Sequence, residues 1–327
     1  MKAIKGKKTD KKDSKWICDI FKHDLVKSSF IPPQSIRELR EISRYRYKLV
    51  CMRSSERNRY QNSMTVSNIG LASVLSDPFG KTASNIMSEI LSSDSIDKKK
   101  ILSLIHGRCK NKDKIFDSLV NSDISTDQRF KLNTTSKHMH ELTTHIDACE
   151  VEMVTRALPY KEQIDLLSTI PGLTPFSAII IISEIGVNIS QFESDKQLVS
   201  WAGLAPCNNE SAGKKKSVRI SKAGQYLKPL LVQIALASIK SEGSYFQIKY
   251  QRIKKRRGHK KAIIAIARMI LVSIYHMLTK MESFNPVDYE SLQNPRPIFK
   301  KQELDIDTAI AFLKQQGFDV SSIQINS

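Results

Sequence analysis

Residues 169–178 read Thr-Ile-Pro-Gly-Leu-Thr-Pro-Phe-Ser-Ala and lie between two apolar segments. The first segment ends near Leu167, and the second covers residues 175–185 and stops at a glycine. Gly172 permits a tight turn, and Pro175 suits the first turn of a helix because its missing N–H would have no partner there. The stretch therefore predicts two helices joined by a short hairpin.

The start of the second helix is a candidate phosphate site. The first N–H groups of a helix have no partner inside it and point outward, toward a position that an anion can occupy. This is the arrangement of a helix-hairpin-helix DNA module, and it makes Gly172, Leu173 and Thr174 candidate contacts. A plain corner between two helices of an all-α core has the same turn chemistry, so the hairpin alone leaves both interpretations open.

The charge of the chain indicates a polyanionic partner. Its 52 Lys and Arg residues against 33 Asp and Glu residues give a net charge of +19, which predicts salt-dependent binding to nucleic acid. Cations gather in a turn expected over residues 252–261, just before an apolar helix expected over residues 262–278. We expect Arg256, Arg257, Lys260 and Lys261 to contact phosphates, which would position the partner without reading its sequence. The alternative is a solvated connection between helices.

A serine followed by cations is the candidate reactive group. Ser211 lies in a stretch, residues 207–216, that we expect to be a loop. The cations that follow it could offset charge on an attacked phosphodiester; they are Lys214, Lys215, Lys216, Arg219 and Lys222. A serine hydroxyl is a weak nucleophile, and its activation would have to come from elsewhere in the protein because the loop has no His or Asp. The alternative is an ordinary polar serine in a surface loop.

Four motifs in a fixed order carry a family resemblance. They are Ile-Pro-Gly-Leu at 170–173, Trp-Ala-Gly-Leu-Ala-Pro at 201–206, Ser-Ala-Gly-Lys at 211–214 and Arg-Ile-Ser-Lys-Ala-Gly at 219–224. This order resembles the transposase domain of insertion-sequence family 110, the DEDD-type transposases. Upstream, the Lys-Thr-Asp-Lys-Lys-Asp of residues 8–13 and the segment 30–40 look like the corresponding parts of that family. The family commonly has two glycines after the serine, where this chain has Ala212 and Gly213.

The resemblance implies a role for two aspartates. It makes Asp10 and Asp13 the last pair of a four-carboxylate, RNase H-like (RuvC-like) site for Mg²⁺. Carboxylates three residues apart share a helix face, and Mg²⁺ commonly takes one or two carboxylates plus phosphate oxygens. On spacing alone, such a pair is typical of a solvated first turn of a helix. Family members carry an apolar strand-bearing region ahead of this motif, whereas only residues 1–8 precede it here, so we expect residues 1–33 to be a remnant of that domain.

The resemblance also implies the partners. Relatives join DNA through a phosphoserine, act with a structured guide RNA and pair their protomers through a coiled coil. We therefore expect double-stranded DNA, a guide RNA and a homodimer or higher homo-oligomer, with Ser211 as the nucleophile. If the carboxylate set is incomplete, the expected function is that of an inactive remnant that still binds nucleic acid. A repair accessory protein is a third class, but it does not account for the serine or the aspartates.

Two sets of apolar residues at helical spacing predict a long helical region. One set is Ile36, Leu39, Ile42, Leu49 and Met52, and the other is Met139, Leu142, Ile146, Cys149 and Met153. The second set has heptad spacing, and the two sets could pair as an antiparallel coiled coil joined by a Ser-rich insert over residues 66–125. A helix that covers a globular core would have similar spacing.

Together these features predict a mainly α protein. We expect an RNase H-like α/β remnant at 1–33, a helical coiled-coil region at 34–160, a transposase domain at 161–284 and a tail at 285–327 in which only residues 305–316 are helical. The five scattered cysteines favour a reducing compartment over a disulfide framework or a zinc site. No signal peptide or membrane-spanning run is evident, so we expect no membrane partner and a cytoplasmic protein. The family resemblance implies that the protein is bacterial and associated with the nucleoid.

Overall fold

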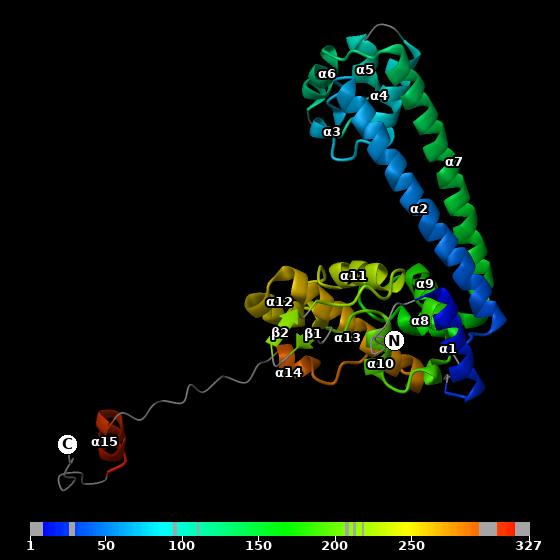
Figure 1. The fold of residues 1–327 in the computed structure, drawn as a ribbon. Helices are drawn as coiled ribbons and strands as arrows, with labels where there is room; N and C mark the ends of the chain where they lie inside the picture. The colour runs from blue at the N-terminus through cyan, green and yellow to red at the C-terminus, as the bar shows by residue number, and fades with distance from the viewer. Residues whose placement is uncertain are drawn as a thin grey trace.

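The computed structural model describes residues 9–25, 30–93, 97–109, 111–206, 209–211, 214–217, 219–293 and 306–317. Helices dominate these residues, which confirms the mainly α prediction. The chain forms a helical body, a long two-helix stalk and a small helical head at the far end of the stalk (Figure 1).

The stalk consists of α2 (Gln34–Val66) and α7 (Thr126–Ala157). The two helices run antiparallel, because Glu38 near the start of α2 pairs with Arg156 near the end of α7. Halfway along, Leu49 packs against Leu142 and Ile146. All five residues predicted on α7 are at least partly buried, but Met52 of α2 is 54% exposed, so its predicted place in the seam is wrong.

The insert between the stalk helices is a folded unit. Its helices are α3 (Leu71–Val74), α4 (Lys81–Ser92), α5 (Lys98–Leu104) and α6 (Lys112–Val120). They enclose an apolar core of their own, which also takes in Tyr60 and Met64 from α2 and Leu132 from α7. The Ser-rich composition did not predict this folded unit. Its serines lie mostly on the outer helix faces, whereas the Ile, Leu and Met residues between them are buried.

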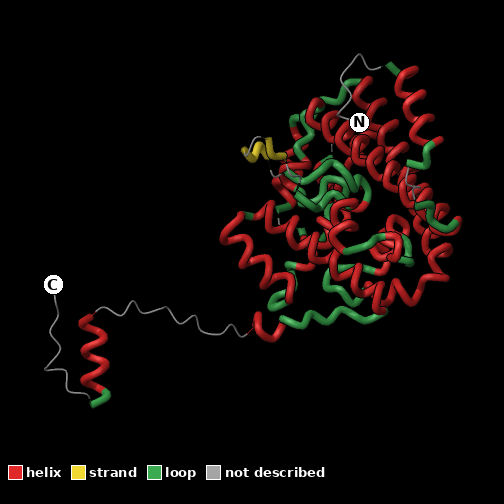
Figure 2. The backbone as a smooth tube through the Cα atoms, turned by 60° about the horizontal axis from the view of Figure 1, so that its bottom comes forward, coloured by secondary structure: helices red, strands yellow, loops and turns green. Residues whose placement is uncertain are grey.

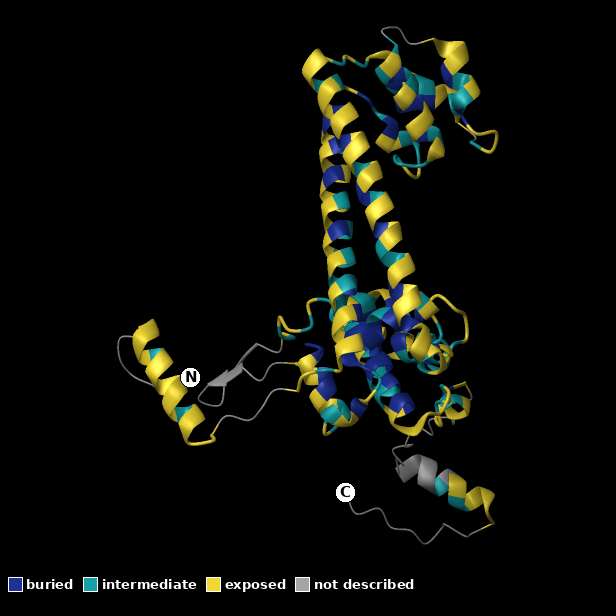
Figure 3. Ribbon diagram, turned by 90° about the vertical axis from the view of Figure 1, so that its right-hand side faces the viewer, coloured by how far each residue is buried: buried dark blue, intermediate teal, exposed yellow. Residues whose placement is uncertain are grey.

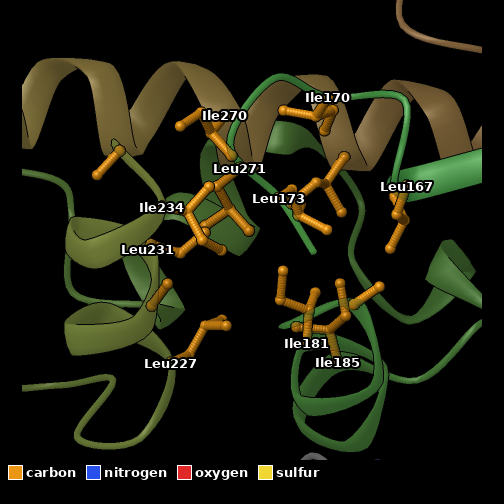
Figure 4. Packing of buried hydrophobic residues seen from close by; sticks show 14 of the residues in the cluster. Leu167, Ile170, Leu173, Ile181, Ile185, Leu227, Leu231, Ile234, Ile270 and Leu271 are labelled. Carbon is orange, nitrogen blue, oxygen red and sulfur yellow. The ribbon is translucent and has the colours of Figure 1, made fainter. Parts of the chain in front are cut away.

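The body is built around one apolar helix, α13 (His259–Lys280). Around it are the 3₁₀ turn η1 (Leu158–Tyr160), α8 (Lys161–Leu167), α9 (Pro175–Ile185), η2 (Ile189–Gln191), α10 (Asp195–Trp201), α11 (Leu227–Ser238), α12 (Tyr245–Arg257) and α14 (Tyr289–Gln293). Figure 4 shows Ile270 and Leu271 of α13 packed among leucines and isoleucines of α8, α9, α11 and the turn after α8.

By length and composition alone, α13 could cross a bilayer. Half of its apolar window is buried in the body, where its contacts with α10, α11 and α12 account for its composition. The predicted hairpin helices match α8 and α9, and the second has the predicted bounds.

Two helices stand apart from the body. Figure 3 shows α1 (Asp10–Lys22) with almost all of its surface exposed, and none of its residues is buried. The helix α15 (Ile306–Gln315), which falls within the predicted helical part of the tail, lies away from the body in Figure 1. The prediction that the tail is helical only there is wrong, because α14 is also a helix and packs against α12.

Candidate nucleic-acid interface

The hairpin between α8 and α9 is fixed from the inside by Ser238 of α11. The Ser238 hydroxyl donates to the carbonyl oxygen of Pro171 at 2.5 Å. Gly172 has a φ of +83°, and a Cβ there would lie 2.5 Å from the backbone nitrogen of Ser238. This close contact requires glycine and holds the turn against the core.

The outer side of the hairpin offers little free backbone. The Leu173 side chain is only 5% exposed, and its N–H donates to Ile170 at 3.1 Å. Leu173 is thus a core residue in this conformation, so the predicted phosphate contacts at this turn depend on Gly172 and Thr174. The Thr174 side chain is exposed and caps α9, accepting a hydrogen bond from the N–H of Ser177 at 3.2 Å.

Two of the sequence motifs meet backbone to backbone. Gly203, after α10, has a φ of +69°, and a Cβ on it would lie 2.3 Å from the carbonyl oxygen of Ala223. Gly224 has the same φ, and a Cβ on it would lie 2.1 Å from the carbonyl oxygen of Ala202. Only glycine fits at either position. We call this contact the glycine clamp, and it brings together the two chain segments that lead into and out of the Ser211 region.

The Ser211 region is a β-hairpin, and the prediction of a loop over residues 207–216 is wrong for the part that is described. Strand β1 (Asn209–Ser211) pairs antiparallel with β2 (Lys214–Ser217), with Ser211 opposite Lys214. A further bridge between Pro206 and Ile220 continues the pairing toward the glycine clamp. Figure 2 shows the hairpin projecting from the helical body. Ala212 and Gly213 lie outside the described residues.

The backbone pairing brings Ser211 beside three of the predicted cations, since Lys214, Lys215 and Lys216 belong to β2. Arg219 and Lys222 follow, and both are exposed. At the base, the Lys228 ammonium donates to the carbonyl oxygens of Ser221 and Ala223 at 2.7 and 2.9 Å, which anchors the segment that leaves the hairpin.

The predicted cationic turn is two helix ends rather than a turn. The helix α12 continues to Arg257, and α13 begins at His259, so only Gly258 separates them. Helix propensity explains the difference, because Lys and Arg are good helix formers and Gly258 alone suffices for the bend. We call residues 254–261 the basic corner. His259 at its centre is held by Tyr250, whose hydroxyl lies 2.7 Å from Nδ1 of the imidazole.

The basic corner has no internal counter-charge. Its Lys and Arg side chains are exposed, and none of them forms an ion pair with an acidic residue in the described ranges. The first turn of α13 has no acidic residue and no side-chain cap. The partial positive charge of that helix end therefore adds to the charge of Lys260 and Lys261, which favours an anion at this corner.

Asp10 and Asp13 lie in the first turn of α1, on one face as the spacing predicts. Thr9 caps this helix, accepting from the N–H of Lys12 at 3.4 Å. No group of three or more His, Cys, Asp or Glu side chains within the described part of the chain is arranged to hold a metal. In Figure 1, α1 lies toward the stalk end of the body and the β-hairpin toward the opposite end, so the strand that carries Ser211 is separated from the aspartates.

A buried ionic network joins the stalk to the body, and the sequence analysis missed it. Glu184 of α9 is 4% exposed. Its two carboxylate oxygens accept hydrogen bonds from the Arg44 guanidinium, at 2.8 and 2.9 Å. Arg40 donates to the carbonyl oxygens of Ser183 and Glu184, each at 2.9 Å, at the carboxyl end of α9. The lone glutamate in the apolar run of α9 was the available signal, because such a charge requires a partner.

The pKa shifts in this network follow the contacts. The hydrogen bond that Arg44 donates to Glu184 raises the pKa of Arg44, whereas burial lowers the pKa of Arg40. The Arg44 guanidinium also lies 4.7 Å from the ring centre of Tyr226, two residues after Gly224. The base of the stalk is thus connected to the glycine clamp.

Two family models match parts of the chain. A family model described as "Transposase IS116/IS110/IS902 family" matches residues 164–251, which include the α8–α9 hairpin, the β-hairpin and most of α12. A second model, described as "Transposase" and built on DEDD-type IS110 sequences, matches residues 1–68. Both family models describe transposases. The chain belongs to the IS110 family of transposases.

Curated relatives resemble part of the chain. The transposase for insertion sequence element IS1111A of Coxiella burnetii is 28% identical over 139 residues, which cover 41% of this chain and 37% of the relative. The pilin gene-inverting proteins of Moraxella bovis and Moraxella lacunata are each 25% identical over 152 residues, covering 46% of this chain and 47% of the relative. The chain thus aligns with less than half the length of these relatives.

Proposed function

We propose that this protein binds DNA as an insertion-sequence transposase or recombinase, with duplex phosphates on the basic corner and Ser211 as the nucleophile. The observation that carries the proposal is the basic corner itself, a set of exposed cations at the junction of α12 and α13 that have no acidic partner among the residues the structure describes. In Figure 1, α12 and the β-hairpin lie toward the same side of the body. A duplex on the corner would thus pass near Ser211.

The β-hairpin suits strand transfer. The Ser211 oxygen would attack a phosphodiester, losing its proton as the phosphoserine bond forms, while the displaced strand oxygen takes up a proton and leaves. Lys214, Lys215, Lys216, Arg219 and Lys222 would offset the charge that builds on the phosphate. Because the glycine clamp holds both ends of this segment, the hairpin can present Ser211 from a fixed base.

Asp10 and Asp13 fit a magnesium ion in ligand type, because Mg²⁺ takes oxygen ligands such as carboxylates. When bound, Mg²⁺ would polarise the phosphodiester. Membership of a DEDD-type family is consistent with use of a divalent metal. We infer that α1 belongs to an RNase H-like unit and must move toward the hairpin for the aspartates to act with Ser211.

Further parts of the proposal concern partners and assembly. We infer that the stalk acts as a coiled coil in a homodimer or higher homo-oligomer, and that the α8–α9 turn binds DNA as a helix-hairpin-helix. A structured guide RNA and a site of action at the bacterial nucleoid complete the proposal. Its supports are the family membership, the net charge of +19 and the antiparallel stalk.

A second candidate function is nucleic-acid binding without cleavage. It is favoured by the separation of α1 from the hairpin and by the lack of a third metal-binding side chain beside Asp10 and Asp13 among the described residues. Both candidates predict binding at the basic corner.

Binding of a blunt duplex at several salt concentrations tests the proposal. Replacing Arg256, Arg257, Lys260 and Lys261 by Ala should weaken binding. It should also make the slope of log affinity against log salt less steep by up to about 3.6, since each lost phosphate contact accounts for roughly 0.9 of that slope. The matched control removes the same charge from the head, at Lys98, Lys99, Lys100 and Lys114, which are exposed. Equal slopes for the two variants would refute the proposed site.

A further inference from the structure

An open pocket of 310 Å³ lies where the start of the stalk meets the body. Its walls come from the segment before α2, from α2, from the carboxyl end of α9 and from α10. The side chains that matter for its chemistry are Phe30, Arg40, Gln191, Phe192, Gln197 and Trp201. The pocket adjoins the glycine clamp along the chain at one point, because Trp201 of its wall is two residues before Gly203.

One wall is aromatic and open to solvent. Phe192 and Trp201 meet edge to face, with ring centres 5.7 Å apart, and Trp201 remains 42% exposed. An indole that leaves so much apolar surface in water beside a pocket is typical of a binding surface. Phe30, 53% exposed, lines the same pocket. These rings provide a stacking surface for a flat ligand.

The remaining groups offer hydrogen bonds from fixed positions. The Gln191 amide nitrogen donates to Ile185, which leaves the Gln191 side-chain oxygen as an acceptor. The Gln197 side-chain oxygen accepts from the N–H of Glu193 at 2.5 Å, which leaves the Gln197 amide nitrogen as a donor. A side-chain donor and acceptor beside an aromatic wall match the edge of a nucleobase.

The lining of the pocket has one charged side chain of each sign, Arg40 and Glu184. Glu184 reaches the pocket, and its carboxylate is bound by Arg44. Arg40 already donates to two carbonyl oxygens at the end of α9, so its guanidinium is held in position. Because the lining carries no excess of positive charge, the exposed aromatic wall is the feature that selects the ligand, and it favours a flat, neutral base.

We propose that this pocket stacks an unpaired nucleobase on Trp201 and contacts the edge of the base through Gln191, Gln197 and Arg40. The proposal rests on the proposed nucleic-acid function and adds a site for a single-stranded part of the partner. A base held here would fix a displaced strand at the entry to the glycine clamp, and thus at the base of the Ser211 hairpin. The base could belong to DNA or to RNA.

Tryptophan fluorescence tests the proposal. The chain has two tryptophans, so Trp16→Phe leaves Trp201 as the only reporter. Short homopolymers of thymidylate, deoxyadenylate, uridylate and adenylate serve as single strands, and a blunt duplex serves as the comparison. Occupancy is measured separately from the anisotropy of labelled strands. Single strands should quench Trp201 by stacking, and the duplex should not do so at equal occupancy.

Affinities of variants provide the second readout. Trp201→Ala should weaken binding of single strands about tenfold and leave duplex binding unchanged, because stacking on one aromatic residue has about this effect. Trp201→Phe should retain most of the affinity, and Trp16→Ala, which removes a tryptophan of similar exposure on α1, should change nothing. Gln197→Ala leaves the rings in place and should reduce the preference among the homopolymers. The deoxy and ribo strands show which nucleic acid supplies the base.

The outcomes separate this proposal from the one on which it rests. If single strands bind as usual but Trp201→Ala has no effect, or if it weakens duplex binding equally, the pocket proposal is wrong and the basic corner is unaffected. If neither strand form binds and the basic-corner variant also has no effect, both proposals are wrong.

Discussion

Gly203 and Gly224 hold the two motifs around the Ser211 hairpin in backbone contact. Each residue has a φ of +69°, and each faces a carbonyl oxygen of the other segment at a distance that no Cβ can occupy. The contact explains why glycines stand at these places in Trp-Ala-Gly-Leu and Ser-Lys-Ala-Gly, and it makes the hairpin an extension of the body core.

The glycine clamp leads to a stability prediction. Gly203→Ala and Gly224→Ala should each lower the free energy of unfolding by more than about 2 kcal/mol, because the left-handed φ alone costs roughly 1–2 kcal/mol and a steric clash adds to it. Gly243→Ala is the matched control, since Gly243 has a φ of +71° with no atom within 4 Å of its added Cβ. Urea denaturation measures the free energy of unfolding of each variant. If all three variants lost the same amount, the close contact at the glycine clamp would have no effect on stability.

The buried network at the base of the stalk leads to a second prediction. Arg44→Ala should destabilise the protein by about 3 kcal/mol, because it leaves the Glu184 carboxylate buried without its bidentate partner. Arg156→Ala removes another arginine of the stalk, whose partners Glu38 and Glu152 are exposed, and should cost no more than about 0.5–1 kcal/mol. Chemical denaturation distinguishes the two, and a small effect of Arg44→Ala would argue against a structural role for the network.

The head should respond to high pH through Tyr60. Burial raises the pKa of Tyr60 to about 12, above the value near 10 expected for an unfolded chain. The neutral phenol therefore stabilises the folded head below pH 10, and this contribution, on the order of 2 kcal/mol, is lost as the pH rises from 10 to 12.

Tyr60→Phe keeps the ring in the core but cannot ionise, so the stability of this variant should fall less between pH 10 and 12 than that of the parent. Tyr45→Phe is the control, because Tyr45 is 54% exposed. Melting curves across this pH range measure the difference. If the stability of Tyr60→Phe and of the parent fell equally between pH 10 and 12, Tyr60 would ionise in the folded head without a cost in stability.

Local patterns in the sequence predicted the helical body well. Pro175 and the glycine at the end of α9 mark its bounds, and the apolar run of α13 indicates a central helix. The β-hairpin was missed because its polar, lysine-rich residues lack the alternation of a half-buried strand. The head was missed because its helices are short and its core is formed by residues far apart in the chain. The glycine clamp likewise depends on a contact that no local pattern contains.

The candidate site was predicted in parts rather than as an arrangement. The cations of the basic corner and the residues around Ser211 were identified individually, but their support by Ser238, Lys228 and Arg44 became evident only from the packed structure. The family resemblance supplied the roles of Ser211, Asp10 and Asp13, which charge and spacing alone left open.

The central claim is that Ser211 becomes joined to DNA. The test uses end-labelled DNA with Mg²⁺, a guide RNA and the protein. Denaturing gels then detect covalent protein–DNA adducts. We expect an adduct that requires Mg²⁺, disappears in Ser211→Ala with DNA binding intact, and persists in Ser217→Ala, whose changed residue pairs with Asn209 at the other end of the β-hairpin. An adduct that persists in Ser211→Ala, or that forms at Ser217 or Ser221, would contradict the assignment of the nucleophile.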